Sequence, residues 1–134
     1  PSTDWHDNTR KTVLVVEDQE DVRKVAVGFL KSFGYRVLEA EDGIIAMGIL
    51  QAQPDIDLLF TDIIMPGGMN GFDLSQAACA HNPALKVIHT SGYPQGALPH
   101  EQIEQISSNL IMKPYHKDEL QQVLADVFSD AQAA

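Results

Sequence analysis

Five short runs of apolar and β-branched residues recur along this chain, and each is followed by a longer segment of mixed polarity. Such runs are typical of strands that are buried on both faces of a parallel sheet. Because they alternate with segments that can form helices, the sequence predicts an α/β fold: a doubly wound, five-stranded parallel sheet with right-handed crossovers. The predicted strands cover residues 12–16, 35–39, 58–61, 86–90 and 110–112.

The segments between these runs carry the residue spacing of amphipathic helices. Helices are predicted over residues 19–33, around 45–50, over 72–80, over 99–106 and around 120–128, and Gly34 is placed to end the first one. Three of these helices have apolar faces that we expect to be buried. The faces consist of Val22, Val25, Ala26, Phe29, Leu30 and Phe33, then Ile45, Ala46, Ile49 and Leu50, and finally Leu120, Val123, Leu124, Val127 and Phe128.

Composition limits the classes of function. The 134 residues are 44% hydrophobic, which suits one compact domain. A formal net charge of -10 repels nucleic-acid backbones and anionic lipid headgroups, so neither nucleic-acid binding nor direct membrane contact is expected. Without an apolar run of roughly 20 residues or a signal-peptide pattern, the expected location is cytoplasmic. The chain divides into a linker or flexible arm (1–11), a domain (12–129) and a tail (130–134).

Cysteine and histidine are assigned no chemistry by the sequence. Cys79 is the single cysteine, and we expect it to be a small buried side chain in a helix. The histidines at positions 6, 81, 89, 100 and 116 lack the spacing of a transition-metal site. Each is therefore predicted to lie at the surface or to be partly buried.

Polar residues stand at the ends of four of the five predicted strands. They are Glu17, Asp18, Asp62, Thr90 and Lys113. Because the carboxyl ends of parallel strands meet at one edge of the sheet, these side chains are expected to gather there. Three carboxylates would repel one another unless a cation such as Mg²⁺ joins them. The lysine and threonine could neutralise and bond an incoming phosphoryl group.

Each of these residues also has an ordinary interpretation. Acidic residues at the start of a loop are usually solvated, and Glu17 or Asp18 could simply favour the N-terminus of the following helix. Thr90 and Lys113 are common residue types at the ends of strands. The functional interpretation depends on all five residues standing at the right strand ends together.

Four sequence blocks resemble the signature segments of response regulator receiver domains. They are Val-Leu-Val-Val-Glu-Asp (13–18), Leu-Leu-Phe-Thr-Asp-Ile-Ile-Met-Pro (58–66), Thr-Ser-Gly-Tyr (90–93) and Met-Lys-Pro-Tyr (112–115). The resemblance spans residues 12–129. It implies a flavodoxin-like (βα)5 fold with strand order 2-1-3-4-5, and a function in two-component signal transduction.

The resemblance also implies roles for the polar residues. Asp62 is the expected phosphoacceptor, and the expected Mg²⁺ ligands are Asp18, Asp62 and the backbone carbonyl of Ile64, with Glu17 bound directly or through water. Lys113 is expected to pair with the phosphoryl oxygens, and Thr90 to donate a hydrogen bond to them. The family further implies a cis peptide bond before Pro114.

Two positions depart from the family pattern. Gly67 and Gly68 make the loop after the third strand one residue longer than usual, which should change the shape of the loop while leaving Asp62 in place. Leu110 stands where the family commonly has a Tyr or Phe that moves inward on activation. The conformational response around the fifth strand is therefore expected to be smaller than in aromatic-switch receivers.

The family also implies a chemical role and partners. A histidine kinase domain would donate the phosphoryl group, and a histidine phosphotransfer protein could receive it; the domain itself would be a phosphoacceptor with at most autodephosphorylation activity. The start at Pro1 and the absence of an output domain favour a piece of a hybrid sensor histidine kinase. A stand-alone single-domain regulator is the alternative.

Three other classes of protein are alternatives to a receiver. A haloacid-dehalogenase-type phosphatase needs a second acid two residues after its nucleophile, and Ile64 stands there. A flavodoxin-like cofactor binder needs a phosphate-binding loop after the first strand, but this chain has an acidic segment at residues 17–21. A non-phosphorylated interaction domain is compatible with the sequence.

Overall fold

A computed structural model describes residues 11–64, 70–91 and 109–133, with side chains described as far as Phe128. The predicted arm apart from Lys11, the two loop glycines and the predicted helix over 99–106 lie outside these residues. None of the helices in the described ranges is long and apolar enough to cross a membrane.

The strands form one parallel sheet in the order β2-β1-β3-β4-β5. Their bounds are Thr12–Val16 (β1), Arg36–Ala40 (β2), Leu58–Asp62 (β3), Lys86–Ser91 (β4) and Leu110–Met112 (β5). The doubly wound sheet and its strand order are therefore confirmed. Because β3 lies in the centre of the sheet, it places Asp62 between the ends of β1 and β4.

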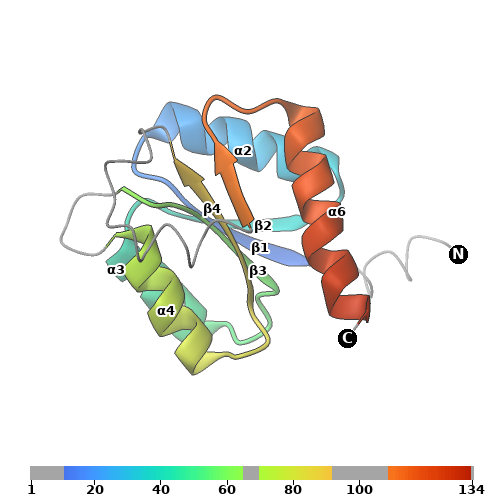
Figure 1. The fold of residues 1–134 in the computed structure, drawn as a ribbon. Coiled ribbons are helices and arrows are strands. Elements are labelled where there is room, and N and C mark those ends of the chain that lie inside the picture. The colour runs from blue at the N-terminus through green and yellow to red at the C-terminus, as the bar shows by residue number, and fades with distance from the viewer. Residues whose placement is uncertain (1–10, 65–69, 92–108, 134) are drawn as a thin grey trace, which may run out of the picture.

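Helices cover both faces of the sheet (Figure 1). Their bounds are Glu20–Ser32 (α2), Gly43–Ala52 (α3), Gly71–His81 (α4) and Lys117–Ala133 (α6). Helices α2 and α6 pack on one face, and α3 and α4 on the other. All of the predicted helices that fall in the described ranges are confirmed.

The core consists of two layers, because successive side chains of a strand point to opposite faces of the sheet. In β1, Val13 and Val15 pack toward α2 and α6, whereas Leu14 and Val16 pack toward α3 and α4. All four side chains are buried, as the continuous apolar run predicts for a central parallel strand. Two packed layers thus hold the carboxyl ends of the central strands in place.

The helix ends follow local rules of capping. Asp42 accepts a hydrogen bond from the Ile45 amide at 2.8 Å at the start of α3, and Asn70 accepts one from the Asp73 amide at 2.8 Å at the start of α4. Gly34 has a φ of +99°, which ends α2 as the sequence predicts.

The predicted buried faces are wrong at two positions. Val25 is 51% exposed and Ile45 is 41% exposed, whereas Val27, which was not assigned to the α2 face, is buried. Helical spacing gives an apolar stripe that is wider than the strip of helix surface touching the sheet. The residues at one margin of the stripe therefore remain in contact with solvent.

The predictions for histidine and cysteine need correction too. His89 is only 5% exposed, because β4 is covered by α4 at this position. Its burial contradicts the surface or partly buried location predicted for every histidine. Cys79 is half-buried rather than fully buried.

Gly71 is the residue through which α4 approaches the end of β3. Its amide donates a hydrogen bond of 2.6 Å to the Ile63 carbonyl. A Cβ atom at Gly71 would collide with the backbone carbonyl of Asp62 and would lie 2.9 Å from the Ile63 Cα. Since these neighbours are backbone atoms, only glycine fits without displacing the strand end.

We predict that Gly71→Ala lowers the free energy of unfolding by about 1–3 kcal/mol, because the added methyl group overpacks against backbone. Gly48 is the matched control, since it lies within α3 and a Cβ there would meet nothing within 4 Å. Gly48→Ala should raise the free energy of unfolding by about 0.5–1 kcal/mol. Urea unfolding followed by circular dichroism measures both, and equal effects of the two substitutions would contradict the close approach.

Candidate functional site

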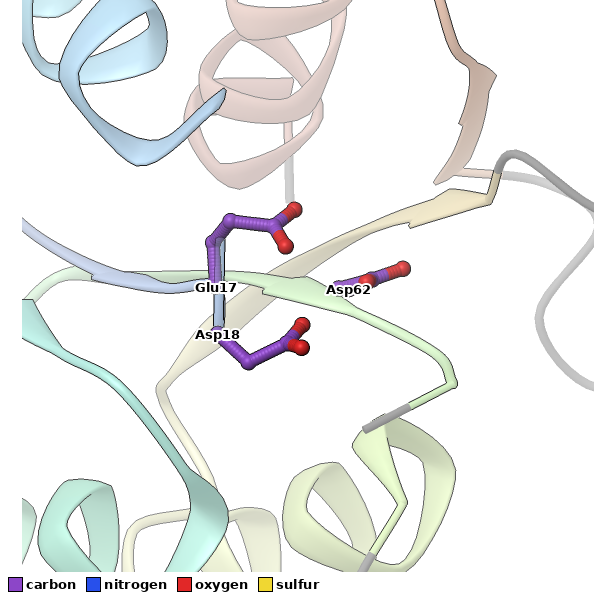
Figure 2. A group of neighbouring side chains, drawn as sticks. All are labelled: Glu17, Asp18 and Asp62. Atoms are coloured by element: carbon purple, nitrogen blue, oxygen red, sulfur yellow. The ribbon is translucent and has the colours of Figure 1, made fainter. Parts of the chain in front are cut away.

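Three carboxylates gather at the carboxyl edge of the sheet. Glu17 and Asp18 follow β1, and Asp62 is the last residue of β3. Each offers an oxygen atom that lies within 4.8 Å of those of the other two. Figure 2 shows that the side chains of Glu17 and Asp18 extend toward the side of Asp62. The predicted acidic cluster is therefore present.

Lys113 joins this cluster from the end of β5. Its backbone amide donates to the Ser91 carbonyl at 2.8 Å, which holds it beside the end of β4. Its Nζ lies 2.7 Å from Glu17 Oε1 and 3.2 Å from Asp62 Oδ2. The peptide bond between Lys113 and Pro114 is cis, as the family resemblance implies.

The electrostatics of Asp62 are unusual for a carboxyl group. The residue is 5% exposed, and burial together with the negative charge of Glu17 raises its pKa to about 6. Lys113 acts in the opposite direction but does not restore the ordinary pKa. Burial lowers the pKa of Lys113, yet its bond to Glu17 and the charge of Asp62 outweigh burial, so that pKa is raised.

The donor atoms fit a hard divalent cation. Asp62 Oδ1 is buried and has no hydrogen-bond partner, the only such side-chain atom within the described ranges. Carboxylate oxygens are the ligands that Mg²⁺ prefers, and a cation beside this atom would offset both the burial and the repulsion from Glu17 that raise the pKa of Asp62. Of the three acids, Asp18 is the exposed one and Glu17 is already engaged by Lys113.

Thr90 lies next to Asp62 on the neighbouring strand. The two residues are paired in the register of β3 and β4, and Thr90 is buried. Its backbone carbonyl accepts a hydrogen bond of 2.9 Å from the Ile63 amide. Ile64, two residues after Asp62, is half-buried. The role of its backbone carbonyl as a metal ligand stays a prediction.

Arg23 is a contributor that the sequence did not indicate. Its Nη1 donates to the Glu17 carbonyl at 2.8 Å, and its Nε donates to Glu39 Oε1 at 3.0 Å. It therefore braces the backbone just before Asp18. An arginine in the first turn of a helix is usually a solvated residue, so no local signal could have singled it out.

Tyr115 lies close to the same site. Its pKa is raised to about 12 by burial, and then by the negative charges of Glu17 and Asp62. Its ring packs edge-on against Phe29 and Phe60, with centroids 6.4 and 6.1 Å away. These aromatic contacts hold the segment after β5, which carries Lys113, against the core.

The chain is similar to known proteins over most of its length. Residues 13–125 match the family described as response regulator receiver domain. The response regulator receiver protein CpdR of Brucella abortus (strain 2308) is 34% identical over 110 residues, covering 82% of this chain and 90% of CpdR. The sensor kinase CckA of the same strain is 33% identical over 110 residues, covering 81% of this chain. The match spans only 12% of CckA.

Solved structures share the fold. The crystal structure of a response regulator receiver domain protein from Clostridium thermocellum superposes with a TM-score of 0.81 at 19% identity. It covers 92% of this chain and 98% of the other. Because the family matches most of this chain and CpdR is similar to it over nearly its full length, this chain belongs to the response regulator receiver domains of two-component systems.

Proposed function

We propose that this domain accepts a phosphoryl group on Asp62 in a Mg²⁺-dependent reaction. The observation that carries the proposal is the environment of that one carboxylate. Asp62 ends the central strand, its Oδ2 is paired with Lys113, and its buried Oδ1 has no hydrogen-bond partner. One oxygen is thus held by an ammonium group, and the other is left for a cation or an electrophile.

The residues around Asp62 would have separate roles in the transfer of the phosphoryl group. An oxygen of Asp62 would attack phosphorus, and the bond from phosphorus to the donor would break with the leaving group taking a proton. Lys113 would stabilise the negative charge of the phosphoryl oxygens, and Thr90 would donate its hydroxyl hydrogen to one of them. Asp18, Asp62 and the carbonyl of Ile64 would hold Mg²⁺, which supplies positive charge beside the transferred group.

Glu17 has a different role in this scheme. Its Oε1 is bound to Lys113 and its Oε2 accepts the Gln19 amide at 3.2 Å. Both oxygens are therefore engaged by the protein. We infer that Glu17 mainly orients Lys113 and reaches the cation through water.

A histidine kinase domain is the proposed phosphoryl donor, and a histidine phosphotransfer protein a possible recipient. Relatives named as sensor kinases, CckA of Brucella abortus and LuxN of Vibrio harveyi, match this chain over 12% and 14% of their lengths. That pattern supports a receiver within a hybrid kinase. The match to nearly all of CpdR supports a stand-alone regulator. A reading frame with kinase-domain codons upstream of Pro1 would decide for the hybrid.

We predict that Asp62→Asn abolishes acid-labile labelling by acetyl phosphate and Mg²⁺, because the nucleophilic carboxylate is lost. Intact-mass spectrometry measures the added phosphoryl group. Asp73→Asn is the matched control, since Asp73 is exposed in the first turn of α4 and should keep full labelling. Equal labelling of the Asp62 variant would overturn the site. No labelling of the unmutated protein would favour an interaction domain.

A second prediction concerns the metal. Asp18→Asn should weaken Mg²⁺ binding by about tenfold or more, whereas Glu17→Gln should have a smaller effect, because Glu17 is engaged with Lys113. Isothermal titration calorimetry measures both affinities. Asp21→Asn controls for the loss of one exposed charge nearby and should bind almost normally.

The same titration should depend on pH in a defined direction. With its pKa raised to about 6, Asp62 takes up a proton below that pH, and the proton competes with Mg²⁺. The affinity for Mg²⁺ should therefore decrease as the pH is lowered from about 7 to about 5. An affinity that rises as the pH falls, or the same affinity in Asp18→Asn as in the unmutated protein, would refute the assigned ligands.

A further inference from the structure

His89 is a buried polar side chain at the interface between β4 and α4. It follows Ile88, which packs in the layer beneath α2 and α6, so the alternation of the strand turns His89 toward the opposite layer. There its Nε2 lies 3.1 Å from the hydroxyl of Ser75 in α4. Burial of an imidazole among apolar residues is unfavourable unless its nitrogen atoms find partners.

The imidazole is neutral near pH 7. Burial lowers the pKa of His89 to about 4, and only a backbone hydrogen bond with Gly71 acts in the opposite direction. The Ser75 hydroxyl lies 3.1 Å from His89 and 2.8 Å from the Phe72 carbonyl, and it has a single hydrogen to donate. Either tautomer of the ring therefore keeps a hydrogen bond to the first turns of α4.

The position of His89 links it to the phosphoacceptor edge. It immediately precedes Thr90, the residue proposed to bond the phosphoryl group. The start of α4 is attached to the end of β3 through the 2.6 Å bond from the Gly71 amide to the Ile63 carbonyl. The Ile63 amide in turn donates to the Thr90 carbonyl at 2.9 Å. The first turn of α4 is thus bonded to the residue that follows β3, and through Ile63 it is linked to Thr90 on β4.

The neighbouring strand on the other side offers His89 no polar side chain. Leu110 of β5 is its partner in the register of the sheet. Because the Leu110 side chain is apolar, it cannot form a hydrogen bond that would make it move together with Thr90. The polar contact of this part of β4 is directed to α4 instead.

We propose that His89 is a positioning residue that couples Thr90 to the start of α4, so that binding of a phosphoryl group at Asp62 displaces the first turns of that helix. The inference rests on the proposed function of Asp62 and deepens it. It assigns the conformational response to the α4 side of the sheet, through the contact between His89 and Ser75.

The test is an NMR titration of the isotope-labelled chain with Mg²⁺ and beryllofluoride, a phosphoryl analogue. The backbone amide signals of Thr90, Gly71 and Ser75 should all shift in the unmutated protein. In His89→Leu, which keeps an apolar group of similar size, the Thr90 signal should still shift. The shifts of Gly71 and Ser75 are expected to fall by about half or more.

Two further variants guard against a general loss of structure. Ser75→Ala removes only the hydroxyl partner and should reduce the Gly71 response in the same direction as His89→Leu. His81→Leu alters an exposed histidine at the end of α4 and should leave every response unchanged. A smaller α4 response in His81→Leu as well would overturn the assignment to His89.

The outcomes separate the two proposals. If beryllofluoride shifts the Thr90 signal and the α4 response is undiminished in both His89→Leu and Ser75→Ala, the coupling role of His89 is overturned. The proposed function of Asp62 is then unaffected. If the unmutated protein gives no response at Thr90, the proposed function of Asp62 fails, and the inference fails with it. Loss of the α4 response in both variants, with the Thr90 response retained, supports the coupling.

Discussion

The carboxylates of Glu17 and Asp62 lie at the ends of adjacent central strands, at a buried edge of the sheet, where their charges repel. Lys113 contacts both, at 2.7 and 3.2 Å, from the end of β5. One ammonium group thereby joins segments that are 96 residues apart in sequence. The compensation is incomplete: burial first, and then the charge of Glu17, still raise the pKa of Asp62 to about 6. The edge retains an excess of negative charge that further positive charge would stabilise.

The gathering of polar residues at the carboxyl edge of the sheet was predictable because it follows from the topology of the fold. Alternation of strands and helices implies a parallel sheet, and a parallel sheet brings all of its carboxyl ends to one side. The placement of Asp62 at the end of the third strand therefore followed from the apolar run over 58–61 alone. The same argument brought Glu17 and Lys113 to the site without any knowledge of distances, and the observed strand bounds differ from the predicted ones by no more than a residue.

The sequence does not predict contacts that depend on how a helix is rotated about its axis or on partners that are distant in the chain. A helical stripe indicates which residues are apolar, but the orientation of the helix against the sheet decides that Val27 is buried and Val25 is not. The bond from Arg23 to the Glu17 carbonyl and the contact of His89 with α4 each require two elements to be docked. Residue type favours a solvated surface position for both side chains, and tertiary packing overrides it.

The two sides of β3 differ in how firmly they are held. On the β1 side, Arg23 bonds the carbonyl of Glu17 and is paired with Glu39 on β2, so charged groups brace the strand end. On the β4 side, the contact from His89 to α4 is between neutral groups. Charge-assisted hydrogen bonds are the stronger class. We therefore expect a new negative charge at Asp62 to displace the β4 side, where His89 contacts α4, more than the β1 side.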